Sequence, residues 1–176
     1  MIAKETTVNS DLIYTGKTIQ LRVDTVEVPN KGYQKREIIE HKGAVGIVAI
    51  TNDNKIVLVK QYRKSIEKEL YELPSGKIEI GESPLDCAIR ELKEETGYST
   101  ENLKLIYKYY ATPVFSNQLV FIYLAKDLTP GKNHLEEDEF IEVYEFDREK
   151  AYDMVINNEI CDSKTVIGLL LTKELI

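Results

Sequence analysis

The chain has 176 residues, of which 43% are hydrophobic, and this suits one compact domain with a sizeable core and a small appended lobe. Its net charge of −7 argues against nucleic acid and anionic membrane surfaces as partners. Residues 1–10 lack the apolar region of a signal peptide and no apolar run approaches the roughly 18 residues of a membrane span, so neither feature is expected. The two cysteines suggest a reducing compartment, and a cytoplasmic location is expected.

An antiparallel β-hairpin is predicted near the N-terminus. Residues 19–28 alternate between apolar and polar side chains, the turn signal PNKG follows at 29–32, and residues 33–41 resume an extended pattern. An isolated two-stranded sheet is marginal in water. The lobe of residues 1–42 is therefore expected to pack on another surface, and a second subunit is one candidate.

Two apolar runs then predict the centre of a second sheet. They are GAVGIVAI at residues 43–50 and KIVLVKQYR at 55–63, and they indicate a hairpin that is buried on both faces. A charged loop is expected at residues 64–70.

Three more strands and two helices are predicted toward the C-terminus. Asp147 is the expected cap of one helix, and Asp162 or Ser163 that of the last. The expected fold class of residues 43–176 is α/β, an α/β/α sandwich with a mixed sheet, and the N-terminal antiparallel β-hairpin lobe precedes it. The strands are expected at residues 103–110, 119–127 and 140–146, and the helices at 148–158 and 164–175.

A helix is predicted from Pro84 to Thr96. Ser83 is a typical N-cap, and Gly97 is placed to close the helix in the left-handed conformation. An apolar stripe spaced i, i+3, i+4 and i+7 is expected to face the core. Its members are Leu85, Ala88, Ile89 and Leu92.

Four carboxylates converge on one flank of this helix. A solvated acidic face is the ordinary explanation for such a cluster. Carboxylates about 4 Å apart repel by roughly 1 kcal/mol in water and roughly 4 kcal/mol near a protein surface, so bound cations explain the cluster better. Oxygen-only ligands select hard ions, and Mg²⁺ or Mn²⁺ is the expected cofactor. The four are Glu82, Glu91, Glu94 and Glu95.

The run GKIEIGESPLDCAIRELKEETGY at residues 76–98 is similar to the Nudix box. The match includes Gly76, Glu82, the run Arg90-Glu91-Leu92, the pair Glu94-Glu95 after one intervening residue, and Gly97; only Tyr98 departs, at a position that is usually aliphatic. The resemblance implies a Nudix fold and metal-dependent hydrolysis of a nucleoside diphosphate linked to a further group. In that reaction water attacks a phosphorus atom.

The resemblance also implies the roles of the box residues. Glu91 and Glu95 are the principal metal ligands, while Glu82 and Glu94 act as a further ligand or as orienting groups in catalysis. Arg90 holds these glutamates by ion pairing, and Gly97 is structural. A carbonyl group of Ser75 or Gly76 is a candidate further ligand.

Segments outside the box resemble the ADP-ribose pyrophosphatase subgroup, among them LVKQYR, YELPSGKIE, EEDEFIEV and CDSKT. ADP-ribose or a related nucleoside diphosphate sugar is then the expected substrate. A glutamate from a late loop of that subgroup positions or deprotonates the water. The role maps onto Glu137, with Glu139 as the second candidate or as a ligand that joins with substrate. The alternative for this loop is a solvated acidic surface.

The same resemblance implies contacts with the substrate and a partner subunit. Arg63 resembles an arginine that contacts the diphosphate, Arg36 a residue that stacks on adenine, and Glu72 a pocket residue beside the diphosphate. The subgroup forms dimers with exchanged N-terminal lobes, so a homodimer is expected.

One loop departs from the subgroup. Where Ser-Pro-Gly and a nearby acidic residue are typical, this chain has Thr112, Pro113 and Val114, with Gln118 after them. Val114 lacks the backbone freedom of glycine and Gln118 lacks a charge, although Gln118 remains a substrate-binding candidate. Another sugar nucleotide or a dinucleotide is therefore an alternative substrate. A non-catalytic nucleotide sensor is an alternative function, which the intact box glutamates disfavour.

Overall fold

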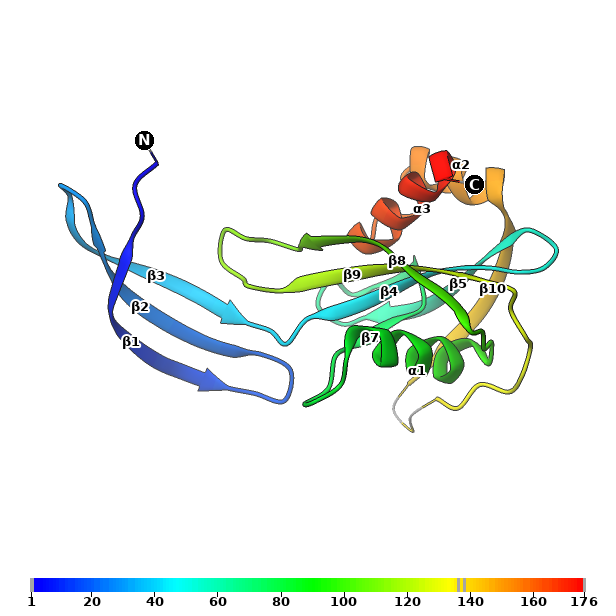
Figure 1. The fold of residues 1–176 in the computed structure, drawn as a ribbon, viewed down its shortest axis with the longest axis horizontal. Coiled ribbons are helices and arrows are strands. Elements are labelled where there is room, and N and C mark those ends of the chain that lie inside the picture. Colours follow the sequence, from blue (N-terminus) through cyan, green and yellow to red (C-terminus); the bar gives the residue numbers. More distant parts are fainter. Residues whose placement is uncertain (1, 136, 138, 176) are drawn as a thin grey trace. The chain divides into compact units, whose positions relative to one another are not determined.

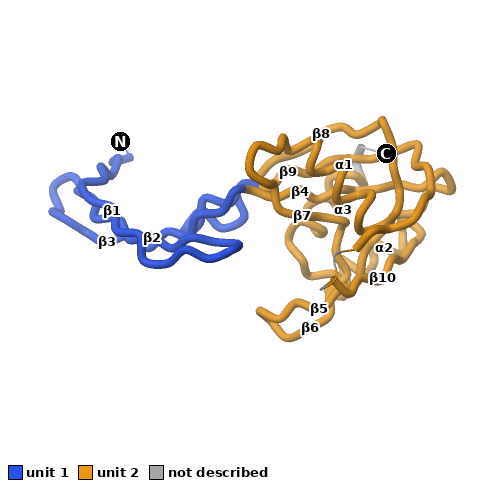
Figure 2. The backbone as a smooth tube through the Cα atoms, turned by 90° about the horizontal axis from the view of Figure 1, so that it is seen from below, with its two compact units in different colours: residues 1–42, 110–119 blue, residues 43–109, 120–176 orange. Residues whose placement is uncertain are grey.

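The computed structural model describes residues 2–135, 137 and 139–175, and its internal contacts divide the chain into two compact units. One unit comprises residues 1–42 and 110–119, and the other comprises residues 43–109 and 120–176 (Figure 2). A short segment from the middle of the chain therefore belongs with the N-terminal unit.

The first unit is built on a three-stranded antiparallel sheet with the order β1-β2-β3 (Figure 1). Its strands are β1 (Thr6–Thr15), β2 (Gln20–Val28) and β3 (Gly32–Glu40). The predicted hairpin is β2 with β3, and β1 extends it to three strands. The register of β1 shifts twice, between Thr7 and Asn9 and between Leu12 and Tyr14. These shifts interrupt the alternation by which a strand is recognised in a sequence, so the pattern conceals β1.

Residues 110–119 pair with the end of β3. The backbone N–H of Ile39 donates to the carbonyl oxygen of Phe115 at 2.7 Å, and that of His41 donates to Asn117 Oδ1 at 2.8 Å. All ten residues of β1 are exposed. The buried side chains of β2 are Asp24 and Val26, so this sheet has little core of its own.

A mixed seven-stranded sheet forms the centre of the second unit. Five strands follow the order β10-β5-β4-β9-β8, while β6 pairs with β5 and β7 pairs with β4. β4 runs parallel to β9 and antiparallel to β5 and β7. The strands are β4 (Ala44–Ile50), β5 (Lys55–Arg63), β6 (Lys68–Glu72), β7 (Ser75–Lys77), β8 (Asn102–Tyr110), β9 (Leu119–Lys126) and β10 (Ile141–Asp147).

Helices cover both faces of this sheet, with α1 (Pro84–Thr96) on one face and α2 (Arg148–Ile156) and α3 (Ser163–Leu175) on the other (Figure 1). The side chains of β4 alternate between two cores, because successive residues of a strand point to opposite faces. Val45, Ile47 and Ala49 pack with α1, whereas Val48 and Ile50 pack with α2 and α3. The predicted α/β/α sandwich is confirmed.

Two local predictions need correction. Residues 64–70 were expected to form a charged loop, but residues 68–70 belong to β6, which continues the hairpin by pairing with residues 59–63 of β5. Lys68 and Glu69 are exposed while Leu70 and Tyr71 are half-buried, so the segment lacks the alternation by which a strand is recognised. At α2 the side chain of Asp147 makes no capping hydrogen bond, whereas Asp162 Oδ2 accepts the backbone N–H of Thr165 at 3.0 Å at the start of α3. Among the described residues, no helix combines the length and apolarity needed to cross a membrane.

Candidate functional site

Helix α1 begins and ends where the sequence predicts. The Ser83 hydroxyl accepts the backbone N–H of Asp86 at 3.1 Å, and Gly97 follows the helix with a left-handed φ of 77°. A Cβ added at Gly97 would also lie 2.6 Å from the carbonyl oxygen of Gly131. Both the backbone conformation and this close neighbour require glycine at position 97.

The face that α1 buries matches the predicted face only in part, because Ala88 and Leu92 are buried as expected. Leu85 and Ile89, which were expected in the core, are 42% and 43% exposed. The helix is instead turned so that its acidic flank points inward. Carboxylates are costly to bury and are ordinarily assigned to solvent, so a pattern of apolar residues alone does not show that Glu95 is buried beside Ala88 and Leu92. The side chains that the helix buries are Cys87, Ala88, Leu92 and Glu95.

Glu91 lies directly against the backbone of β7. A Cβ built on Gly76 would lie 1.7 Å from Glu91 Oε1 and 1.9 Å from the carboxyl carbon. The antiparallel pairing of β7 with β4 holds Gly76 opposite Val45. The carboxylate therefore occupies the space that any side chain at position 76 would need, and only glycine lets it reach the strand.

Glu95 is 3% exposed and is fixed by the same strand, because its Oε2 accepts the backbone N–H of Ser75 at 2.8 Å. Burial raises the pKa of Glu95 to about 8, against the opposing effect of this hydrogen bond. Burial likewise raises the pKa of Glu91 to about 7, although Arg90 opposes the rise. The charge of Glu139 adds to the rise of both pKa values. Two carboxylates held together away from water are unfavourable by themselves, and a bound cation would relieve this cost.

Arg90 gathers the other box glutamates. Its Nε donates to Glu82 Oε1 at 2.8 Å and its Nη2 donates to Glu82 Oε2 at 3.1 Å, which makes a bidentate pair. Its Nη1 donates to Glu91 Oε1 at 2.7 Å and to Glu94 Oε2 at 3.0 Å. The hydrogen bonds with Arg90 hold the pKa of Glu82 down at about 2. This ion pairing is the arrangement that the sequence motif predicts for Arg90.

The donor set suits a hard divalent cation. Glu91 and Glu95 offer oxygen ligands only, and their buried negative charge lacks full compensation. Among the residues that the structure describes, no three acidic, histidine or cysteine side chains are already gathered around one point. Glu82 would first have to separate from Arg90 to act as a ligand. Glu91 and Glu95 are the residues best placed to hold a divalent cation, although one oxygen of Glu91 is also paired with Arg90.

These pKa values predict that the metal-free fold weakens as the pH rises. An ordinary glutamate titrates near 4.5, whereas the pKa is about 7 for folded Glu91 and about 8 for folded Glu95. The folded state retains protons that the unfolded state has released. The resulting stabilisation is complete below about pH 4.5 and is lost as the pH rises toward 8, by about 1.4 kcal/mol per unit of pKa difference.

Urea unfolding of chelator-treated protein at about pH 5 and about pH 8 measures this loss. Glu95→Gln removes one of the two titrating groups, so its free energy of unfolding should fall less between these pH values. Parallel profiles for the wild type and Glu95→Gln would contradict the raised pKa of Glu95.

The described part of the late acidic loop contacts the box helix through His134. The backbone N–H of His134 donates to the carbonyl oxygen of Glu94 at 2.9 Å, which ties the loop to the last turn of α1. Glu137 lies in an exposed turn, whereas Glu139 is half-buried and its charge acts on both Glu91 and Glu95. The structure therefore places Glu139 within electrostatic reach of the box carboxylates.

Arg63 and Glu72, predicted as separate substrate contacts, form one partly buried ion pair. Arg63 Nε and Nη2 each donate to a Glu72 carboxylate oxygen at 2.6 Å. Lys164 Nζ donates to Glu72 Oε2 as well, and to Asp162 Oδ2 at 3.1 Å. Burial alone would raise the pKa of Glu72, but Arg63 and Lys164 lower it overall. Lys164 was assigned no role from the sequence and Asp162 only that of a helix cap, although both lie in the CDSKT segment that carries part of the family resemblance.

The remaining substrate candidates lie in the first unit. Arg36 on β3 pairs with Glu5, with Nε to Oε2 at 3.0 Å and Nη2 to Oε1 at 2.5 Å. Gln118 is half-buried, and its carbonyl oxygen accepts the backbone N–H of Ala111 at 3.0 Å, while Val114 is exposed. The roles of Arg36 and Gln118 stay predictions.

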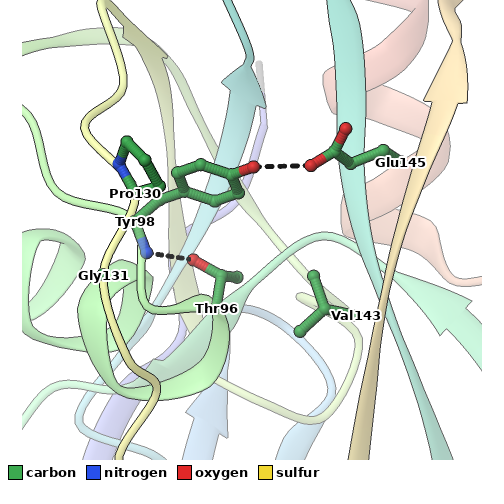
Figure 3. Close-up of a pocket in the computed structure, with 6 residues that line it drawn as sticks. All are labelled: Thr96, Tyr98, Pro130, Gly131, Val143 and Glu145. Carbon is green, nitrogen blue, oxygen red and sulfur yellow. Dashed lines mark hydrogen bonds between the residues drawn. The ribbon is translucent and has the colours of Figure 1, made fainter.

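A surface pocket of about 460 Å³ lies beyond the C-terminal end of α1 (Figure 3). Tyr98, where the box departs from the family pattern, donates its hydroxyl to Glu145 Oε1 at 2.5 Å, and its backbone N–H donates to Thr96 Oγ1 at 3.1 Å. The bond to Glu145 raises the pKa of Tyr98 to about 12. The tyrosine thus joins the end of the box helix to β10. The lining residues are Thr96, Tyr98, Pro130, Gly131, Val143 and Glu145.

Known proteins are similar to this chain in sequence and in fold. A NUDIX domain matches residues 40–164. The chain is 44% identical over 168 residues to the methanol dehydrogenase activator of Bacillus methanolicus and 43% identical over 168 residues to the ADP-ribose pyrophosphatase of Bacillus subtilis (strain 168). Each match covers 94% of this chain and 91% of the relative. A crystal structure of an ADP compounds hydrolase has a TM-score of 0.86 at 25% identity, covering 98% of this chain and 94% of that one.

Proposed function

This chain belongs to the Nudix family, and we propose that it is a pyrophosphohydrolase for ADP-ribose or a related nucleoside diphosphate sugar. The proposed products are a nucleoside monophosphate and a sugar phosphate. The observation that carries the proposal is the pair of buried carboxylates, Glu91 and Glu95, held at the Gly76 strand with raised pKa values. Similarity to an ADP-ribose pyrophosphatase and to an ADP compounds hydrolase supports the choice of substrate.

A divalent ion, with Mg²⁺ or Mn²⁺ proposed, would be held by Glu91 and Glu95 and would supply charge neutralisation and a more acidic water. Arg90 keeps Glu82 and Glu94 aligned beside these ligands. A carbonyl group of Ser75 or Gly76 stays a candidate further ligand.

In the proposed reaction Glu137 accepts a proton from water while the water oxygen forms a bond to phosphorus. The bond between that phosphorus and the bridging oxygen breaks, and the second phosphate leaves with the electron pair. Glu139 acts as a further ligand when substrate is bound, which its influence on Glu91 and Glu95 supports. Arg63 contributes its planar fork of donors to the diphosphate.

Mutation distinguishes the proposed roles of the two loop glutamates, Glu137 and Glu139. Glu137→Gln is expected to lower kcat by about 100-fold, because it removes the general base without removing a resident ligand. Mg²⁺ affinity, measured by calorimetry, should hardly change in Glu137→Gln, and Glu139→Gln should lower kcat less. If Glu139→Gln is the more damaging change, Glu139 takes the role of the base.

A homodimer and a cytoplasmic location belong to the same proposal. The exposed apolar side chains of the first unit support a partner surface, and Val8, Leu12, Ile13 and Tyr14 on β1 are among them. Cys87 and Cys161 are both free, which suits a reducing compartment. Light scattering of the purified protein tests the dimer.

A panel assay tests the activity itself. The purified protein is mixed with Mg²⁺ and, separately, ADP-ribose, ADP-glucose, GDP-mannose, NADH and diadenosine polyphosphates, and the released products are measured. Most efficient conversion of ADP-ribose to AMP and ribose 5-phosphate supports the proposal. Preference for another sugar nucleotide or a dinucleotide would indicate that the loop with Val114 and Gln118 is adapted to that substrate. No turnover at all would favour a nucleotide sensor.

A second candidate function comes from the relative named methanol dehydrogenase activator, which is as similar to this chain as the pyrophosphatase. The chain would then raise the activity of an alcohol dehydrogenase. Adding it, with Mg²⁺, to methanol dehydrogenase and following alcohol oxidation tests this candidate, with Glu95→Gln as the control that separates an effect of hydrolysis from one of binding.

A further inference from the structure

A chain of four alternating charges links the end of β5 to the start of α3. Arg63 is bidentate to Glu72, Lys164 donates to the same carboxylate, and Asp162 accepts from Lys164. Glu72 is 1% exposed and the side chain of Lys164 is 14% exposed, while that of Arg63 is 40% exposed. The buried carboxylate therefore has one enclosed cation and one cation that faces solvent.

Glu72 does not need the second cation while Arg63 is paired with it, although Lys164 also pairs with Asp162. A bidentate arginine already satisfies both oxygens of Glu72, and desolvating a lysine is costly. It becomes necessary if Arg63 leaves, because removing the partner of a buried charge is strongly unfavourable. Glu72 Oε2 accepts from both Arg63 and Lys164, so Lys164 already occupies the position from which it would compensate the carboxylate alone.

The surroundings hold Lys164 in this place. Asp162 Oδ2 accepts from the backbone N–H of Thr165 at 3.0 Å and from its hydroxyl at 2.6 Å. The hydroxyl of Thr165 in turn accepts the backbone N–H of Leu73 at 2.8 Å. The start of α3 is thereby tied to the residue that follows Glu72. The Glu95 carboxylate acts on Arg63, and Lys164 acts on Glu95, so both cations lie near the candidate metal ligands.

We propose that Lys164 is a positioning residue that keeps Glu72 neutralised while Arg63 turns its guanidinium to the substrate diphosphate. The inference rests on the proposed function, since it requires a diphosphate as the ligand of Arg63. Lys164 acts through Glu72 and does not itself contact the substrate.

The test is steady-state hydrolysis by Lys164→Met, which retains much of the side-chain length without the charge. Arg63 is then retained by Glu72, so KM for ADP-ribose should rise about tenfold or more while kcat changes by less than about threefold. A purely architectural role would instead lower kcat, or the folded fraction, at unchanged KM. Lys164→Arg should restore KM. Lys173→Met, on the exposed face of the same helix, is the matched control and should leave both constants unchanged.

Mutation of Glu72 identifies the route of the effect. With Glu72→Gln there is no charge to compensate, so adding Lys164→Met to Glu72→Gln should leave KM unchanged. An equal rise in KM with and without Glu72→Gln would overturn the inference and indicate direct contact of Lys164 with the substrate. The double variant leaves no unpaired carboxylate at position 72, so it remains informative if Lys164→Met alone fails to fold.

Wild-type turnover separates the two proposals. If the wild type prefers another diphosphate, the same variants are measured with that compound, because only the diphosphate is needed. A wild type that hydrolyses no diphosphate removes both the proposed function and this inference. An active wild type with an unchanged KM in folded Lys164→Met removes the inference alone.

Discussion

Glu95→Gln is expected to reduce turnover roughly 100-fold or more while the fold survives. The amide oxygen of glutamine can still accept the Ser75 N–H, which Glu95 Oε2 accepts at 2.8 Å, so the local hydrogen bond is retained. The substitution removes a negative charge that burial already disfavours. The loss of activity should therefore come without a loss of stability.

Three measurements on the purified variant check this expectation. Initial rates with Mg²⁺ give the loss of turnover, calorimetric titration with Mn²⁺ gives the loss of metal affinity, and urea unfolding gives the stability. Glu101→Gln is the matched control, because it makes the same chemical change at an exposed residue outside the site. Near-normal turnover by Glu95→Gln would remove the assignment of Glu95 as a metal ligand.

The elements that the sequence predicts well are those with local signals. The limits of α1 follow from Ser83, Pro84 and Gly97, which act within one turn of the helix ends. The strands of the central sheet follow from long apolar runs, because strands buried on both faces leave little room for polar residues. By contrast, β1 escapes prediction because its two register shifts disrupt the period of two on which recognition depends.

Candidate site residues could be named from the sequence, whereas their partners in the fold could not. Chemical type and spacing mark Glu91 and Glu95, but which face of α1 is buried depends on the strand beside it. The pairing of Glu72 with Lys164 joins residues 92 positions apart, and no local pattern encodes it. From the sequence, Arg63 and Glu72 were predicted as independent substrate contacts. In the folded chain Arg63 instead donates two hydrogen bonds to the carboxylate of Glu72.

Gly76→Ala is the second change expected to have a large effect, and it follows from geometry that the sequence does not reveal. The methyl group would enter the space that the Glu91 carboxylate now fills, with contacts of 1.7 Å to Oε1 and 1.9 Å to the carboxyl carbon. Backbone conformation gives no cause for strain, because Gly76 is not among the residues with positive φ. The clash is with the end of a flexible side chain, so Glu91 should rotate away and the fold should persist.

Turnover by Gly76→Ala should fall by roughly two orders of magnitude, close to the effect of Glu91→Gln, because both remove one carboxylate from the metal ligands. The two changes should not add: Gly76→Ala introduced into Glu91→Gln should cost little further activity, since its damage acts through that side chain. A double-mutant cycle tests this, in which rates and Mn²⁺ affinities are measured for the wild type, the two single variants and the double variant. Full additivity would mean that Gly76 contributes separately, and its carbonyl group as a metal ligand would then be the explanation to pursue. Unchanged turnover in Gly76→Ala would instead show that Glu91 can reach its ligand position from another rotamer.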